Sequence, residues 1–225
     1  MEIKKFLAKL AVIFALTSCT NTPDLETGEI QTFQMIKNAF EQQKHSKGFV
    51  DARTLLSREQ IDAANIPVLF VELESGQNGT LTPYPGQGIG QTWLGADGAT
   101  ITMDRGILKA SRGMGDDLMG SSVSMPAWSK IDNSVKTYRR ELSYISGNNK
   151  ILEHSFECSI EKNDRKEVIK IWDINFFVTK FKENCGNNEF EIKNTYYLDD
   201  QEIVRRASQF HSETLGYIFT ERLDR

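Results

Sequence analysis

The chain has 225 residues, of which 39% are hydrophobic, and its formal net charge is −4 at neutral pH. That length and apolar content are enough for one substantial core or two small ones. A mildly acidic chain without a basic stripe is a poor candidate for nucleic-acid binding, because contacts to phosphate dominate that affinity.

Residues 1–18 have the composition of an export signal. Lys4, Lys5 and Lys9 give a positive start, and Leu10–Leu16 is an apolar run too short for a membrane-spanning helix. Removing its three lysines and one glutamate leaves 24 basic and 30 acidic residues, a net charge near −6.

The next residues, Leu16–Cys19, resemble a bacterial lipobox, in which a leucine and two small residues precede a cysteine. In such proteins the thiol is alkylated with diacylglycerol, and cleavage makes the cysteine the N-terminus. The resemblance therefore predicts lipidated Cys19 and a flexible tether over residues 19–29, because two or three acyl chains anchor a protein stably. Thr20 is not the aspartate that retains such proteins at the inner membrane, which points to the outer membrane and its periplasmic face. The alternative is a plain secretory signal, or an uncleaved anchor, with a chance cysteine.

Helix is predicted near the start of the mature chain. Apolar residues recur at helical spacing over Ile30–Gln43, which indicates an amphipathic helix. Ser57 followed by Gln60 has the spacing of a capping box, which predicts a second, short helix ahead of Pro67.

Strands are predicted from Val68 onward. Val68–Leu73 is an apolar run, and two further runs flank Asp104-Arg105-Gly106, which predicts a hairpin that turns there. Alternate residues are apolar over Tyr138–Tyr144 and, most strictly, over Glu153–Glu161. Such alternation indicates strands with one solvated face, and hence an antiparallel sheet.

The segment Lys166–Phe181 is apolar on both faces over much of its length. We therefore predict one long central strand here, after a turn near Asn163-Asp164. No repeat or second linker interrupts the chain, so residues 30–225 are predicted to form a single β-rich domain.

Several motifs resemble those of the YjbF-like family of group 4 capsule and exopolysaccharide lipoproteins. One is "DRGILKASRGMGDDLMG" (Asp104–Gly120), and the others are Cys185, "NTYYLDD", "RRASQF" and "LGYIFTERL", in that order. Each motif is weak alone, and their order carries the resemblance. Ser111 stands where the family's threonine is expected, which keeps the hydroxyl.

The resemblance implies an all-β, mainly antiparallel fold of an open-barrel or sandwich-like kind, with one or two N-terminal helices. It also implies a role in secretion or assembly of surface polysaccharide, but no catalytic mechanism. The leading hypothesis is therefore a non-enzymatic lipoprotein that contacts polysaccharide export proteins or an acidic polysaccharide. The alternatives are an enzyme that modifies the polymer and a structural envelope or assembly factor without a glycan role.

The chain has three cysteines, an odd number for an exported protein. If lipid occupies Cys19, then Cys158 and Cys185 remain as one pair in an oxidising compartment, and we predict a disulfide. The alternative is two free, buried thiols.

The segment Ser111–Gly120 is the first candidate for a contact site. Arg112, Asp116 and Asp117 could hydrogen-bond sugar hydroxyls, and the two aspartates could begin a short helix. We favour the alternative of a tight structural turn with the following apolar residues in the core. Adjacent aspartates also do not suit a glycosidase, whose two carboxylates face each other across a bond.

Tyr84 and Trp93 bracket a glycine-rich stretch and could stack on a sugar ring, although aromatic anchors of a connection are the commoner outcome. The glycines lack the spacing of a phosphate-binding loop. The histidines lack metal-ligand spacing, and no serine lies in a nucleophile elbow, so we expect no cofactor, no metal and no catalytic residue. Lys136, Arg139 and Arg140 form a small basic cluster that could meet an acidic polysaccharide, but solvated strand ends are the simpler interpretation.

Overall fold

The computed structural model describes residues 51–85, 90–132, 134–145 and 150–225. The export signal, Cys19, the tether over residues 19–29 and the helix expected over Ile30–Gln43 lie outside these ranges. Within them, no helix combines the length and the hydrophobicity needed to cross a membrane.

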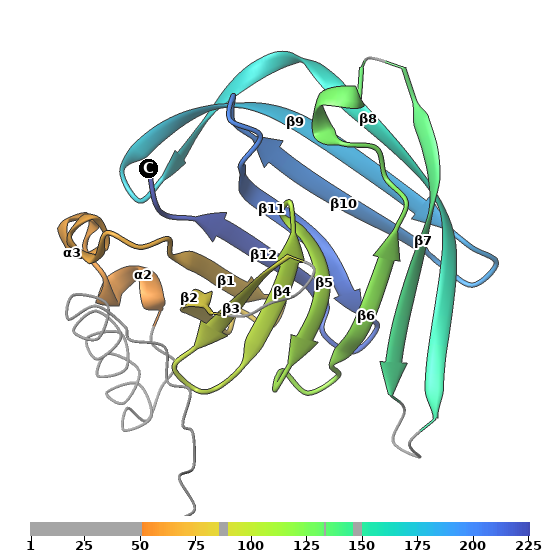
Figure 1. Ribbon diagram of the computed structural model, residues 1–225, viewed down its shortest axis with the longest axis horizontal. Helices are drawn as coiled ribbons and strands as arrows, with labels where there is room; N and C mark the ends of the chain where they lie inside the picture. Colours follow the sequence, from red (N-terminus) through yellow and green to blue (C-terminus); the bar gives the residue numbers. More distant parts are fainter. Residues whose placement is uncertain (1–50, 86–89, 133, 146–149) are drawn as a thin grey trace, which may run out of the picture.

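Among the described residues, twelve antiparallel strands form one sheet, which curls into a nearly closed barrel (Figure 1). Each strand pairs with the next along the chain from β1 to β5 and from β6 to β12, and the pairing of β1 with β12 joins the two series. Strands β5 and β6 are therefore the two edges of the sheet. The strands are β1 (Leu69–Leu73), β2 (Asn78–Tyr84), β3 (Gln91–Gly95), β4 (Thr100–Asp104), β5 (Ile107–Arg112), β6 (Leu118–Val123), β7 (Lys136–Ile145), β8 (Ile151–Ile171), β9 (Ile174–Gly186), β10 (Glu191–Leu198), β11 (Val204–Ser212) and β12 (Gly216–Arg222).

Two short helices, α2 (Ala52–Leu55) and α3 (Arg58–Ala64), precede the sheet. The predicted capping box of α3 is confirmed, because the side chains of Ser57 and Gln60 each accept a hydrogen bond from the other's main-chain N–H. Helix α2 was not predicted. It has a single turn, which the side chain of Asp51 caps by accepting a hydrogen bond from the N–H of Arg53.

The prediction of a mainly antiparallel sheet from Val68 onward is confirmed. The hairpin of β4 and β5 turns at Arg105 and Gly106, both with left-handed backbone angles (φ 49° and 80°). Along β8, Phe156, Cys158 and Ile160 are buried, as the alternation predicts.

The single long strand predicted over Lys166–Phe181 is wrong. Strand β8 continues through Asn163-Asp164 with only a shift in register between Lys162 and Lys166. The chain reverses later, at Trp172-Asp173, where both residues have left-handed angles (φ 42° and 68°). The segment is thus the tip of the β8–β9 hairpin, and its two apolar faces do not mark a central strand.

The barrel interior holds the main core. Trp128, in the short 3-10 helix η1 (Trp128–Lys130), packs with its ring centroid 5.2 Å from those of Phe181 and Tyr196. Its indole N–H donates to the main-chain oxygen of Arg105 at 3.0 Å, which ties η1 to the β4–β5 turn.

A second apolar core lies on the outer face of the sheet. Leu69 belongs to the main core whereas its neighbour Phe70 belongs to the second, so β1 contributes to both. Helices α2 and α3 cover Phe70, and the β8–β9 tip adds buried residues such as Ile171 and Phe176. The tip and the N-terminal helices therefore pack together.

Gln209 of β11 fixes the β4–β5 hairpin across the barrel. Its Oε1 accepts a hydrogen bond from the N–H of Leu108, and its Nε2 donates to the oxygen of Gly106, both at 2.9 Å. A Cβ atom at Gly106 would lie 2.3 Å from a methyl carbon of Val204, so only glycine permits this approach.

Candidate functional site

Arg112, an expected contact residue, closes the junction between β5 and β6. Its guanidinium donates hydrogen bonds to the main-chain oxygens of Ser111 at 2.5 Å and Leu118 at 3.0 Å. Within the described part of the chain, β5 and β6 have no ladder of paired residues. These side-chain bonds therefore join the two edges of the sheet and give Arg112 a structural role.

The loop after Arg112 is a tight turn. The carboxylate of Asp117 accepts hydrogen bonds from the N–H groups of Gly113 and Met114, both at 2.9 Å. Leu118 follows in the core, whereas Met119 is 38% exposed. The short helix that the aspartates could begin does not form, because Asp117 binds N–H groups that precede it.

Behind this turn lies a buried polar pair that the sequence analysis did not single out. Oγ of Ser111 lies 2.8 Å from Nε2 of His211 and accepts a hydrogen bond from the N–H of Leu118 at 3.0 Å. Burial lowers the pKa of His211, and the smaller opposing effect of Asp116 and Asp117 does not reverse this. The imidazole is therefore neutral at pH 7.

Ser111 and His211 are not arranged as a nucleophile and its base. Their exposed fractions are 1% and 0%, so no substrate reaches them. Among the described residues, Nδ1 of His211 has no hydrogen-bond partner, whereas a catalytic histidine is oriented by a third group. The alternation along β11, which buries Ala207, Gln209 and His211, is the sequence signal that could have found this pair.

A cavity of about 220 Å³ lies at the end of the barrel where the β4–β5 turn meets the β10–β11 loop. Its apolar lining includes Leu69, Trp93, Met103 and Val204. Its polar lining is Gln91, Arg105, Glu202, Thr220 and Arg222. An apolar pocket with a few polar groups at a barrel mouth is the usual form of a small-ligand site.

Two expected residues belong to this end of the barrel. Trp93 lines the cavity and is 3% exposed, with the guanidinium of Arg222 4.9 Å from its ring centroid. Tyr84 is 52% exposed at the end of β2, and its main-chain oxygen accepts a hydrogen bond from Nε2 of Gln91, which also lines the cavity. Arg112 lies at the opposite end of β5, so the five expected contact residues do not form one site.

The guanidinium groups of Arg105 and Arg222, which both line the cavity, differ in their hydrogen-bond partners. Arg222 donates a hydrogen bond to Asp224, which holds it over Trp93. Arg105 is 43% exposed, and its guanidinium approaches Asp104 only to 3.7 Å. The Arg105 side chain makes no hydrogen bond within the described residues, so its donors are available to a ligand in the cavity.

A charged network occupies the centre of the barrel. The fully buried carboxylate of Glu183 accepts hydrogen bonds from Arg140 at 2.8 Å, Tyr138 at 2.6 Å, and Tyr196 and Asn194 at 2.7 Å. Burial alone would raise the pKa of Glu183, but Arg140 and these hydrogen bonds lower it. Glu183 is therefore ionised at pH 7 and paired with Arg140.

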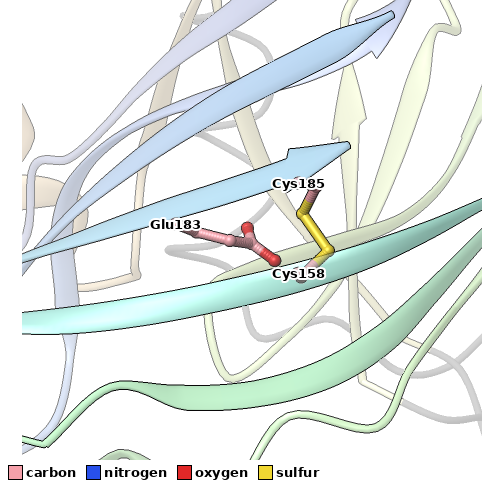
Figure 2. A group of neighbouring side chains, drawn as sticks. All are labelled: Cys158, Glu183 and Cys185. Atoms are coloured by element: carbon pink, nitrogen blue, oxygen red, sulfur yellow. A yellow bond between two sulfur atoms is a disulfide. The ribbon is translucent and has the colours of Figure 1, made fainter. Parts of the chain in front are cut away.

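The Glu183 carboxylate lies beside the disulfide between Cys158 and Cys185 (Figure 2). The two cysteines are directly opposite each other on β8 and β9. Among the described residues, these three side chains are the one group close enough together to hold a metal ion. Both sulfurs are in the disulfide, however, so they cannot act as thiolate ligands.

The basic cluster considered at Lys136, Arg139 and Arg140 is not one surface. Arg140 points into the barrel, and Arg139 lies on the opposite face of β7, where it pairs with Glu141 at 3.0 Å. Lys136 lies 3.3 Å from Asp132. Because alternate residues of a strand point to opposite faces, this run offers no basic patch to a polysaccharide.

Comparisons with known proteins identify the relationship. Residues 33–223 match the family described as group 4 capsule polysaccharide lipoprotein gfcB, YjbF. The crystal structure of the hypothetical lipoprotein YmcC from Escherichia coli (K12) is similar, with a TM-score of 0.65 and 18% identity over 87% of this chain and 95% of that chain. That likeness shows the fold alone, and a comparison with curated proteins finds no match. Because the family match spans most of its length, the chain belongs to the YjbF family of group 4 capsule polysaccharide lipoproteins.

Proposed function

We propose that this lipoprotein is held at the periplasmic face of the outer membrane, where it serves the secretion or assembly of capsule or exopolysaccharide without catalysing a reaction. The family match over residues 33–223 carries the proposal. The lipobox-like Leu16–Cys19 provides the anchor, and Thr20 after it favours the outer over the inner membrane.

We place the contact with the glycan at the barrel-mouth cavity. Its volume of about 220 Å³ suits one sugar unit, and Trp93 offers an apolar wall. The unused donors of Arg105 favour a carboxylated unit, because a guanidinium binds carboxylate in a bidentate manner. Contact with a polysaccharide export protein is the other route by which the lipoprotein would act.

Three features favour binding over catalysis. The Ser111–His211 pair and the Glu183 network are sealed from solvent. Asp116 and Asp117 are sequence neighbours, and Asp117 is engaged with main-chain N–H groups. A polysaccharide-modifying enzyme needs an accessible pair of catalytic groups, and these residues do not provide one.

The test uses acidic oligosaccharides prepared from the host's own surface polysaccharide, with a carboxyl-reduced form for comparison. Binding is followed by the change in tryptophan fluorescence of the mature protein, because Trp93 lines the cavity. We expect Arg105→Ala to weaken binding by about tenfold, the value of one charge-assisted contact. Arg139→Ala, which removes an exposed arginine far from the cavity, is the matched control and should bind like the wild type.

Two added readouts separate the rival functions: analysis of the oligosaccharides after incubation, and capture of host proteins on the mature lipoprotein. Shortened or altered oligosaccharides after incubation would support a polysaccharide-modifying enzyme. Absence of glycan binding, with capture of an export protein, would restrict the role to the export machinery. Absence of both would favour a structural envelope factor.

A further inference from the structure

The tip of the β8–β9 hairpin has apolar residues on both faces but buries only one. Ile169 and Phe176 face the second core, where they are 7% and 9% exposed. Val168 and Phe177 are directly opposite each other on the outer face and are 56% and 65% exposed. No contact within the described residues buries this outer pair.

Lysines flank the exposed pair on the same face of the hairpin. Lys166 and Lys170 stand two residues before and after Val168 on β8, and their side chains are 54% and 65% exposed. They pair with Asp200 and Asp173, but exposed ion pairs of this kind are weak. Residues 162–180 contain five basic and three acidic residues, so the tip is positive in an acidic protein.

Helices α2 and α3, which precede β1, lie on the same side of the barrel as this tip (Figure 1). The guanidinium of Arg53 in α2 lies 3.9 Å from the ring centroid of Phe70 and 5.8 Å from that of Trp172 at the hairpin turn. The indole N–H of Trp172 donates to the main-chain oxygen of Leu56 at 3.0 Å. The N-terminal helices and the tip are thus fixed to each other.

We propose that the outer face of the β8–β9 tip rests on an anionic phospholipid surface and thereby orients the barrel relative to the membrane. This face comprises Lys166, Val168, Lys170, Asn175, Phe177 and Thr179. Phe177 and Val168 enter the interface, and the lysines meet lipid phosphates, the arrangement typical of surface-bound segments. Because the proposed anchor confines the protein near the membrane, a weak contact is enough to hold one orientation.

The exposed apolar pair at the β7–β8 end of the barrel is less suited to an anionic membrane surface. Ile145 and Ile151 face each other at the β7–β8 end and are 47% and 69% exposed. The residues that follow on the same face of β8 include Glu153, Glu157 and Glu161, and all three are exposed. Anionic lipid repels that face, so charge selects the β8–β9 tip.

The experiment reconstitutes the acylated mature protein into vesicles of phosphatidylethanolamine with one quarter phosphatidylglycerol, some brominated in the acyl chains. Phe177→Trp places a reporter on β9 at the β8–β9 tip, and Ile151→Trp places one at the distant start of β8. The wild type supplies the background of the native tryptophans. We expect at least twofold quenching of the added fluorescence in Phe177→Trp and none in Ile151→Trp. Both sites are exposed, so neither change should disturb folding.

Three outcomes would overturn the proposal: quenching in Ile151→Trp alone, quenching in both variants, and quenching in neither. Reversing the lysines in Lys166→Glu/Lys170→Glu, on the Phe177→Trp background, should return the quenching to the wild-type level. If it does not, lipid charge is not what the tip recognises.

This inference rests on the lipid anchor of the proposed function, and the two can fail separately. Loss of the anchor appears as protein that does not float with the vesicles. Failure of the docking appears as floating protein whose residue-177 reporter is not quenched.

Discussion

Arg140 and Glu183 form an ion pair inside the barrel, with Nη2 of Arg140 2.8 Å from both carboxylate oxygens of Glu183. Their side chains are 3% and 0% exposed. Each charge is tolerated there only because the other, with Tyr138, Tyr196 and Asn194, replaces the water it has lost. The pair links β7 to β9, strands that lie on either side of β8.

Breaking this pair should be costly. We expect Arg140→Met to lower the free energy of unfolding by about 3–5 kcal/mol, because it leaves the Glu183 charge buried without its partner. Urea unfolding followed by circular dichroism measures the change. Arg139→Met, on the solvated face of the same strand, should change stability by less than about 1 kcal/mol. Equal effects of the two substitutions would contradict the assigned roles.

The same pair predicts how stability depends on pH. The pKa of Glu183 is lowered in the folded protein from its ordinary value of 4.5. Its contribution is therefore fully present above pH 4.5 and is lost as the pH falls through the folded-state pKa. Glu183→Gln should flatten the decline of unfolding free energy as the pH falls below about 4.5. A decline as steep as that of the wild type would show that other groups cause it.

The disulfide between Cys158 and Cys185 closes a loop with a sequence separation of 27. In the chain-entropy model this should stabilise the fold by about 3–4 kcal/mol. Cys158→Ala/Cys185→Ala should lower the urea midpoint accordingly. Thiol counting on the unfolded, unreduced mature protein should find no reactive thiol and, after reduction, two. Two thiols before reduction would rule out the bridge.

Removing the hydroxyl should have opposite effects on protein stability at two serines near the β5–β6 junction. Ser111→Ala leaves the N–H of Leu118 and Nε2 of His211 without their partner, and we expect a loss of about 1–3 kcal/mol. Oγ of Ser121 is buried without a hydrogen-bond partner among the described residues. Ser121→Ala should therefore be neutral or stabilising. Thermal unfolding of the two variants, compared side by side, tests both expectations.

The pattern of alternate apolar residues predicted the antiparallel sheet because one face of each strand packs in the barrel. The same alternation places Arg140 and Glu183, the buried ion pair, on the apolar faces of their strands. Arg140 lies between Tyr138 and Leu142 on the apolar face of β7, and Glu183 lies between Phe181 and Cys185 on that of β9. Two opposite charges on buried strand faces indicate an ion pair. The sequence alone does not show which strands lie close enough for their side chains to form it.

The error at the β8–β9 hairpin has a physical cause. A segment apolar on both faces is usually a central strand, and here the second core buries one face while the other stays open. Trp172-Asp173 is also not a turn sequence that propensity would select, because left-handed angles favour glycine and asparagine. The cavity was not predictable either, since its lining comes from five strands, the β4–β5 turn and the connections that precede β3 and β11.

Lipid attachment should depend on Cys19. We expect mass spectrometry of membrane-extracted protein to find Cys19 as an acylated N-terminus, because the lipobox pattern precedes it. Cys19→Ser should leave the outer-membrane fraction, whereas Ser18→Ala, which keeps a small residue before the cysteine, should stay in it. An unmodified N-terminus at another residue would rule out the anchor.

The most direct test of the proposed role is to compare surface-exposed with total polysaccharide in a host strain that lacks this lipoprotein. We expect the exposed polymer to fall several-fold while synthesis continues, so that polymer accumulates inside the envelope. The wild-type chain should restore export, and Cys19→Ser should not. Unchanged surface polysaccharide in the deletion strain would contradict a role in capsule or exopolysaccharide export.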